Sequence, residues 1–238
     1  MQLCCNYQWI EYMENKQTNN QNQMKECIYF DSGYNCSAKR LKQMISTLVS
    51  SSFNSDHSEH SEHSENDEND QNEQEIKQTK TIKQLLKNIT ISYPNDLLSL
   101  LANIISLERE SKSIKLIVID SIVSFYKKTS YDNAIKLQTI QTLMQHLSVL
   151  SQQKNCAIVI VNHLTTKEIN RNYTSLNYEL SKEFPFYFTK SLGVSFSCFI
   201  KLTLYLFQLP TETQIIVHSA DSFINHHITY SISDNGFM

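Results

Sequence analysis

Glycine is scarce in this chain of 238 residues, which has only three, at Gly33, Gly193 and Gly236. A glycine-rich phosphate-binding loop needs glycines close together so that backbone amides can cradle phosphate oxygens. No stretch of the sequence meets that requirement, which excludes such a loop within these residues.

Long apolar runs and closely paired cysteines are also missing. No run approaches the roughly twenty apolar residues that a helix needs to cross a bilayer, and Glu11 and Glu14 make the first residues unlike a signal peptide. The six cysteines include no Cys-x-x-Cys pair, so we expect reduced core thiols rather than zinc ligands or disulfides. These features predict a soluble intracellular protein without a membrane partner.

Acidic residues are concentrated in one segment. Residues 56–75 hold nine of the 24 acidic residues and none of the 21 basic ones. The rest of the chain therefore has 15 acidic and 21 basic residues, a formal charge of +6, which favours a polyanionic partner. Residues 50–77 are almost wholly polar and repeat His-Ser-Glu three times, so we expect a disordered acidic insert in a single domain over 1–238.

Four short aliphatic runs predict the strands of a parallel sheet. Residues 115–120 and 156–163 end abruptly in polar side chains, which is typical of strands buried on both faces. Residues 26–31 and 89–92 are similar. Apolar residues at helical spacing separate the first two runs and predict a crossover helix; they are Ile140, Leu143, Met144, Leu147 and Leu150.

Further elements follow from the same patterns. Residues 38–49 have helical spacing, and residues 94–110 predict a helix with a proline in its first turn. Residues 199–207, 214–219 and 228–232 are consecutive strand-like runs, which predict an antiparallel or mixed edge appended to the parallel sheet.

Polar residues follow two of the predicted parallel strands. In open α/β sheets, ligands bind beyond the carboxyl ends of such strands. We therefore expect Asp120, Ser121, Asn162 and His163 to line one crevice.

The order of these segments resembles the RecA/RadA recombinase superfamily, in its eukaryotic strand-exchange branch. The matching segments are residues 1–5, 28–32 with 39–41, 116–122, 158–163, and 192–195 with 230–237. Within that branch, residues 39–44, 119–122 and 217–220 are most similar to the paralogue family named X-ray repair cross-complementing protein three, and residues 165–167 to the C-type recombinase paralogue.

The resemblance implies an α/β fold, with a RecA-like, mostly parallel sheet flanked by helices and an antiparallel C-terminal extension. It aligns residue 1 just after the family's phosphate loop, which implies a truncated core domain. It also implies ATP and magnesium as cofactors, with Asp120 holding the metal and with Ser121, Asn162 and His163 near the nucleotide.

Two positions depart from the family and weaken catalysis. Gly33 stands where the family's water-activating glutamate is expected, and glycine offers no proton acceptor. His163 replaces the glutamine that senses the γ-phosphate; it could still donate a hydrogen bond to a phosphate, or it could simply end the strand beside Asn162. Asp120 and Ser121 have the alternative role of capping the next helix.

The resemblance also places two DNA-contacting loops after these strands. They correspond to residues 126–131 and 165–190, which mix basic and aromatic side chains as sequence-tolerant single-strand binders do. The candidate DNA contacts are Lys127, Lys128, Tyr131, Lys167, Arg171 and Tyr173.

The function implied is accessory work in homologous recombination and DNA repair, in the nucleus, with little or no nucleotide binding. Expected partners are other recombinase paralogues, the main strand-exchange recombinase and single-stranded DNA. Two alternatives remain open at this point: an active DNA-dependent ATPase whose gene model omits the phosphate loop, and an α/β interaction module without nucleotide.

Overall fold

Four parallel strands form the central sheet, in the order β2-β1-β3-β4. They are β1 (Glu26–Asp31), β2 (Ile89–Ser92), β3 (Ile114–Asp120) and β4 (Ala157–Ile160). All four aliphatic runs predicted from the sequence are therefore strands, and all pair in parallel. The computed structural model describes residues 1–18, 24–55, 67–168, 186–190, 192, 196, 199–208, 213–219, 226–230, 232–233 and 236–237.

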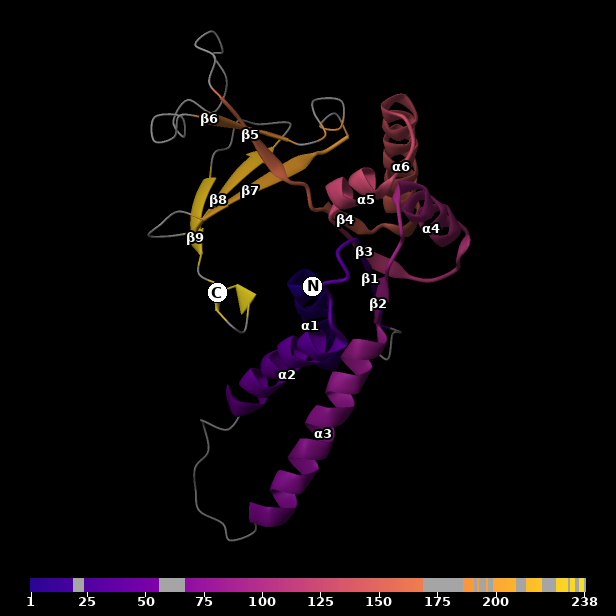
Figure 1. Cartoon of the computed structure of the whole chain (residues 1–238). Helices are drawn as coiled ribbons and strands as arrows, with labels where there is room; N and C mark the ends of the chain where they lie inside the picture. Colours follow the sequence, from indigo (N-terminus) through magenta and orange to yellow (C-terminus); the bar gives the residue numbers. More distant parts are fainter. Residues whose placement is uncertain are drawn as a thin grey trace.

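Helices cover both faces of this sheet (Figure 1). One face carries α4 (Leu97–Arg109), α5 (Ile122–Lys128) and α6 (Asn133–Lys154), and the other carries α1 (Gln2–Gln17), α2 (Ala38–Ser55) and α3 (Asp67–Lys87). Side chains of β3 alternate between the two cores: Ile117 and Ile119 pack with α4 to α6, whereas Leu116 and Val118 pack with α1 to α3. Burial on both faces explains why the strands have no polar alternation.

The predicted helices are present, with boundaries set by caps and packing. The crossover helix is α6, and its five predicted core positions are all buried. The helix predicted over 94–110 begins at Leu97, because the side chain of Asp96 accepts a hydrogen bond from the Ser99 amide at 2.8 Å and so caps it.

The acidic segment differs from expectation at both ends. Disorder was predicted over 50–77, yet α2 continues to Ser55 and α3 begins at Asp67; residues 56–66 lie outside the described part. Two physical reasons favour the helix. Glu, Gln and Lys are good helix formers, with Glu73 and Lys77 paired at 3.8 Å. The C-terminal end of α3 is also packed into the core through Leu85, which is fully buried.

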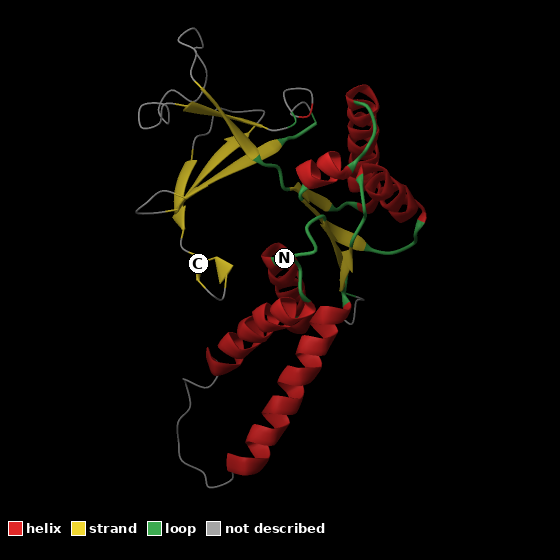
Figure 2. Cartoon of the chain, viewed as in Figure 1, coloured by secondary structure: helices red, strands yellow, loops and turns green. Residues whose placement is uncertain are grey.

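The C-terminal strands form sheets of their own (Figure 2). They pair antiparallel, as predicted, but among the described residues none pairs with the parallel sheet, so the expected appended edge is wrong. These strands are β5 (Leu164–Glu168) with β6 (Phe186–Lys190), β7 (Leu202–Gln208), β8 (Thr213–Ser219) and β9 (His226–Tyr230), and β10 (Ile232–Ser233) with β11 (Gly236–Phe237).

The hydrophobicity of the helices and the state of the cysteines both bear on predictions from composition. None of the described helices has both the length and the apolar character that crossing a bilayer requires. The five described cysteines are buried free thiols, as predicted: Cys4, Cys5, Cys27, Cys36 and Cys156.

Candidate functional site

The carboxyl ends of β1, β3 and β4 meet at one edge of the sheet. Asp31 and Asp120 are register partners at the ends of β1 and β3. The β3–β4 pairing continues past the strand end, because the Val161 amide donates to the Ile119 carbonyl at 2.9 Å and the Ile122 amide donates to the Val161 carbonyl at 3.1 Å. This brings Asn162 and His163 to the same edge as Asp120 and Ser121, as the sequence predicts.

Asp120 is held by a tyrosine from the neighbouring strand. The Tyr29 hydroxyl donates a hydrogen bond to Asp120 Oδ2 at 2.5 Å. Tyr29 is 6% exposed, and burial, followed by this carboxylate, raises its pKa above the ordinary value for tyrosine. The phenol therefore stays protonated and remains a donor, so one oxygen of the predicted metal ligand is already engaged within the protein.

Ser121 serves as a helix cap. Its hydroxyl is the N-cap acceptor of α5, at 3.4 Å from the Ser124 amide, and lies 2.8 Å from the Ser124 hydroxyl. The Ser121 amide donates to the Ser32 hydroxyl at 2.8 Å, and the Asp120–Ser121 peptide is cis. Ser121 is buried and its polar atoms have partners, which favours the capping role over contact with a nucleotide.

Asp31 organises the loop that follows β1. Its two carboxylate oxygens accept hydrogen bonds from the Gly33 amide at 2.9 Å and from the Cys36 amide at 2.6 Å. The carboxylate is buried, so these bonds satisfy it without a metal ion. Gly33 is held close to Asp31 with no acidic side chain of its own, and a Cβ there would lie 2.4 Å from Asn35 Nδ2.

Asn162 carries a buried side-chain donor that has no hydrogen-bond partner among the described residues. Its Oδ1 accepts a hydrogen bond from the His163 amide at 2.8 Å, while its Nδ2 is buried and makes no hydrogen bond. A buried amide donor of this kind can bind an oxygen acceptor, including a phosphate oxygen. His163 is exposed beside it.

The described residues do not by themselves fit ATP and magnesium. Among them, no group of three or more His, Cys, Asp or Glu side chains is placed to hold a metal ion. Both oxygens of Asp31 accept hydrogen bonds from backbone amides, and Asp120 accepts a hydrogen bond from the Tyr29 hydroxyl. No catalytic step through a nucleotide follows from this geometry.

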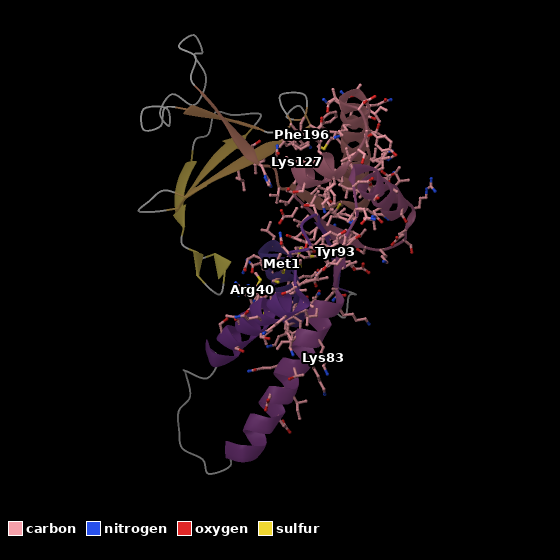
Figure 3. The ribbon with its side chains drawn as sticks, viewed as in Figure 1. Met1, Arg40, Lys83, Tyr93, Lys127 and Phe196 are labelled. Atoms are coloured by element: carbon pink, nitrogen blue, oxygen red, sulfur yellow. The ribbon has the colours of Figure 1, made fainter. Side chains whose placement is uncertain are left out.

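The predicted DNA contacts divide into those that the structure places and those that it does not. Lys127, labelled in Figure 3, lies exposed at the C-terminal end of α5. Lys128 is exposed next to it, and Tyr131 is 48% exposed just beyond the helix. Lys167 lies in β5, paired in register with Tyr187 of β6. Arg171 and Tyr173 lie outside the described residues.

Three tyrosines were missed in the sequence. Besides Tyr29, these are Tyr34, whose ring lies 4.8 Å from Lys128 Nζ, and Tyr93, whose ring stacks on that of Tyr34. Both tyrosines come shortly after predicted strands, and this position could have identified them in the sequence as residues near the strand ends. Their contact with each other depends on the strand order.

Comparison with known proteins supports the fold alone. No family model matches the sequence, and a search of curated proteins finds no similar sequence. The structure is similar to the crystal structure of the RadB recombinase, with a TM-score of 0.56 and 16% sequence identity over 90% of this chain and 78% of that chain. The chain therefore has a RecA-like α/β fold, as the sequence predicted.

Proposed function

We propose that this chain is an accessory protein of homologous recombination that acts on single-stranded DNA in DNA repair. The main support is the placement of Lys127 and Lys128 beyond the strand ends of a RecA-like sheet, because exposed lysines at such an edge can neutralise phosphates. The charge of +6 outside the acidic segment agrees with a polyanionic ligand.

In this role the chain works with other recombinase paralogues and the main strand-exchange recombinase, in the nucleus. The sequence resemblance to the paralogue family named X-ray repair cross-complementing protein three, with the C-type paralogue second, is the support for these partners. A RadB recombinase as structural neighbour is compatible with that family of functions.

Nucleotide binding is weak or lost in this proposal. ATP and magnesium would approach Asp120, Ser121, Asn162 and His163. Tyr29 occupies an oxygen of Asp120, however, and Ser121 is committed to its helix cap. Asn162 retains a buried donor without a partner among the described residues, and this donor contacts a phosphate oxygen without promoting hydrolysis.

A second function is favoured by one specific contact. The Tyr29 hydroxyl engages one oxygen of Asp120, so this carboxylate is less available to magnesium, which favours an α/β interaction module that uses neither nucleotide nor DNA. Such a module would bind its protein partner while showing no affinity for single strands.

The experiment that separates the two is fluorescence anisotropy of a labelled single strand titrated with the purified chain at several salt concentrations. Replacing Lys127, Lys128 and Arg171 with Ala should weaken binding at least about tenfold at low salt and flatten its salt dependence, because each lysine–phosphate contact adds to the slope. A matched control replaces Lys80, Lys83 and Lys87, three lysines of α3, and should bind like wild type.

Each outcome has a definite meaning. If the Lys127, Lys128 and Arg171 variant binds as tightly as wild type, then residues 126–131 and 165–190 do not contact DNA through these three side chains. An absence of single-strand binding by wild type, together with capture of a recombinase paralogue, would favour the interaction module.

A further inference from the structure

Two tyrosines form an exposed aromatic stack at the carboxyl edge of the sheet. Tyr34 belongs to the loop after β1, and Tyr93 directly follows β2, the neighbouring strand. Their ring centroids are 5.5 Å apart and their planes differ by 9°. Tyr34 is 57% exposed and Tyr93 42% exposed, so much of this aromatic surface faces water instead of the core.

Both rings are held in place from outside the stack. The Tyr34 hydroxyl donates to Asn95 Oδ1 at 3.2 Å, and the Tyr93 hydroxyl donates to the Cys36 carbonyl at 3.1 Å. The rings therefore need little further ordering when a ligand stacks on them, which reduces the entropic cost of binding.

Tyr34 also has a strained backbone. Its φ is 55°, in the left-handed region that favours glycine. Strain of this kind costs about 1 kcal/mol or more and is common at functional sites. The side chain is mostly exposed, so core packing does not compensate for the strain; the hydrogen bond to Asn95 and the stack on Tyr93 hold the ring instead.

Positive charge lies next to the stack. Lys128 Nζ lies over the Tyr34 ring, 4.8 Å from its centroid, and donates a hydrogen bond to the Ser32 carbonyl. Both partners are uncharged, so its positive charge is not neutralised there, and Lys127 precedes it. Within the described ranges, neither lysine forms an ion pair with a carboxylate. The nearby Asp31 and Asp120 accept hydrogen bonds from the protein itself.

We propose that Tyr34 and Tyr93 form a stacking platform for a base of single-stranded DNA, with Lys128 contacting the adjoining phosphate. This inference rests on the proposed single-strand binding and names the part of the surface that contacts a base. An aromatic face beside a cation is the combination that binds single strands without reading sequence. Acidic side chains can pair with the lysine but have no extended flat face to stack on the rings, whereas every base has one, so the observations favour a nucleic acid.

The test compares two labelled strands of equal length and charge, oligo-dT and an abasic strand, by fluorescence anisotropy with the full chain. Wild type should bind oligo-dT about five- to tenfold more tightly, because stacking adds to the phosphate contacts that both strands share. Tyr34→Gly should abolish this preference while leaving affinity for the abasic strand unchanged. Lys128→Ala should weaken binding of both strands.

Tyr34→Gly also separates loss of binding from loss of folding. Glycine adopts a φ of 55° without strain, which offsets part of the loss of the Asn95 hydrogen bond, the ring stack and the chain entropy, so the variant should still unfold cooperatively and melt only slightly below wild type. Phe199→Ala, which removes an exposed aromatic ring elsewhere, is the matched control and should keep the preference for oligo-dT.

The outcomes distinguish this inference from the proposed function. Equal wild-type affinity for the two strands, unchanged in Tyr34→Gly, would overturn the platform and leave single-strand binding intact. An absence of binding to either strand would overturn both. Binding of an acidic peptide that Tyr34→Gly abolishes, without any preference for oligo-dT, would assign the stack to a protein partner and overturn the platform.

Discussion

At the scale of single residues, the hydrogen bond between Tyr29 and Asp120 has the largest effect on what the site can bind. Asp120 was the strongest metal-ligand candidate in the sequence because it ends a buried strand. Its partner lies 91 residues earlier in the chain, and the two meet only because β1 pairs with β3. A carboxylate that accepts a bond from a buried phenol contributes to stability whether or not a metal is ever bound.

Replacing Tyr29 with Phe should lower the free energy of unfolding by about 2 kcal/mol, because a hydrogen bond to a charged acceptor is lost. Chemical denaturation at neutral pH measures this. Tyr126→Phe, which loses only a 3.5 Å contact to Asn133, is the control and should change stability little. In an Asp120→Asn background the Tyr29→Phe effect should shrink; an undiminished effect would show that the two side chains are not coupled.

The same tyrosine predicts a pH dependence. The pKa of Tyr29 is raised in the folded protein, whereas the unfolded chain has the ordinary value of about 10. The stabilisation is therefore present below about pH 10 and is lost as the pH rises further. Wild type should lose more stability than Tyr29→Phe over that alkaline range.

At the scale of elements, helix starts are decided by side chains that the periodic pattern does not reveal. Helices α4 and α6 both follow an aspartate at the N-cap. The Asp96 carboxylate bonds to the Ser99 amide, whereas Asp132 makes no side-chain cap bond. In the acidic segment, composition was misleading instead: its polar residues predicted disorder, but α3 is helical from Asp67 onward.

Asp96→Ala should destabilise the protein by about 1 kcal/mol at pH 7, the usual cost of losing an N-cap bond. Asp132→Ala, with the same residue type and position, should cost clearly less. Thermal unfolding of both variants provides the comparison, and equal losses would contradict the capping role.

The difference should also depend on pH. The hydrogen bond with Ser99 lowers the pKa of Asp96 below its ordinary value. The stabilisation by Asp96 is therefore present above about pH 4, the ordinary value for aspartate, and is lost as the pH falls through the folded pKa. Below that range, Asp96→Ala and wild type should converge.

At the scale of the whole molecule, a RecA-like sheet carries an edge whose acidic groups are engaged internally. The Asp31 carboxylate accepts hydrogen bonds from two backbone amides, and the Asp120 carboxylate accepts one from the Tyr29 hydroxyl. Gly33 has no carboxylate. Within the described ranges, this edge therefore offers neither Asp31 nor Gly33 as a free carboxylate, and one oxygen of Asp120 is engaged. The exposed lysines and tyrosines next to that edge are what the molecule presents to a ligand.

The chain of 238 residues should show no ATP turnover, with or without single-stranded DNA, because it contains neither a glycine-rich loop nor a carboxylate at Gly33. Release of inorganic phosphate under multiple-turnover conditions measures this. Sustained hydrolysis by the pure protein that Asp120→Ala abolishes would contradict it.

Much of the fold could be predicted because burial on both faces leaves a local signature. Aliphatic runs ending in polar residues identified β1 to β4, and helical spacing identified α6. The gathering of Asp120, Ser121, Asn162 and His163 at one edge was also predictable, since parallel strands end together. The separate C-terminal sheets were not, because alternation predicts a strand without naming its partner.

The sequence by itself determined the four parallel strands, the crossover helix α6 and the absence of a glycine-rich loop within these residues, since these depend on side-chain periodicity and residue type along short stretches. Only the tertiary structure decided that Tyr29 engages Asp120 and that Tyr34, Tyr93 and Lys128 form one surface. Those contacts join residues 59 to 94 positions apart, and a hydrogen bond or a ring stack depends on where the neighbouring strand lies, which no local pattern encodes.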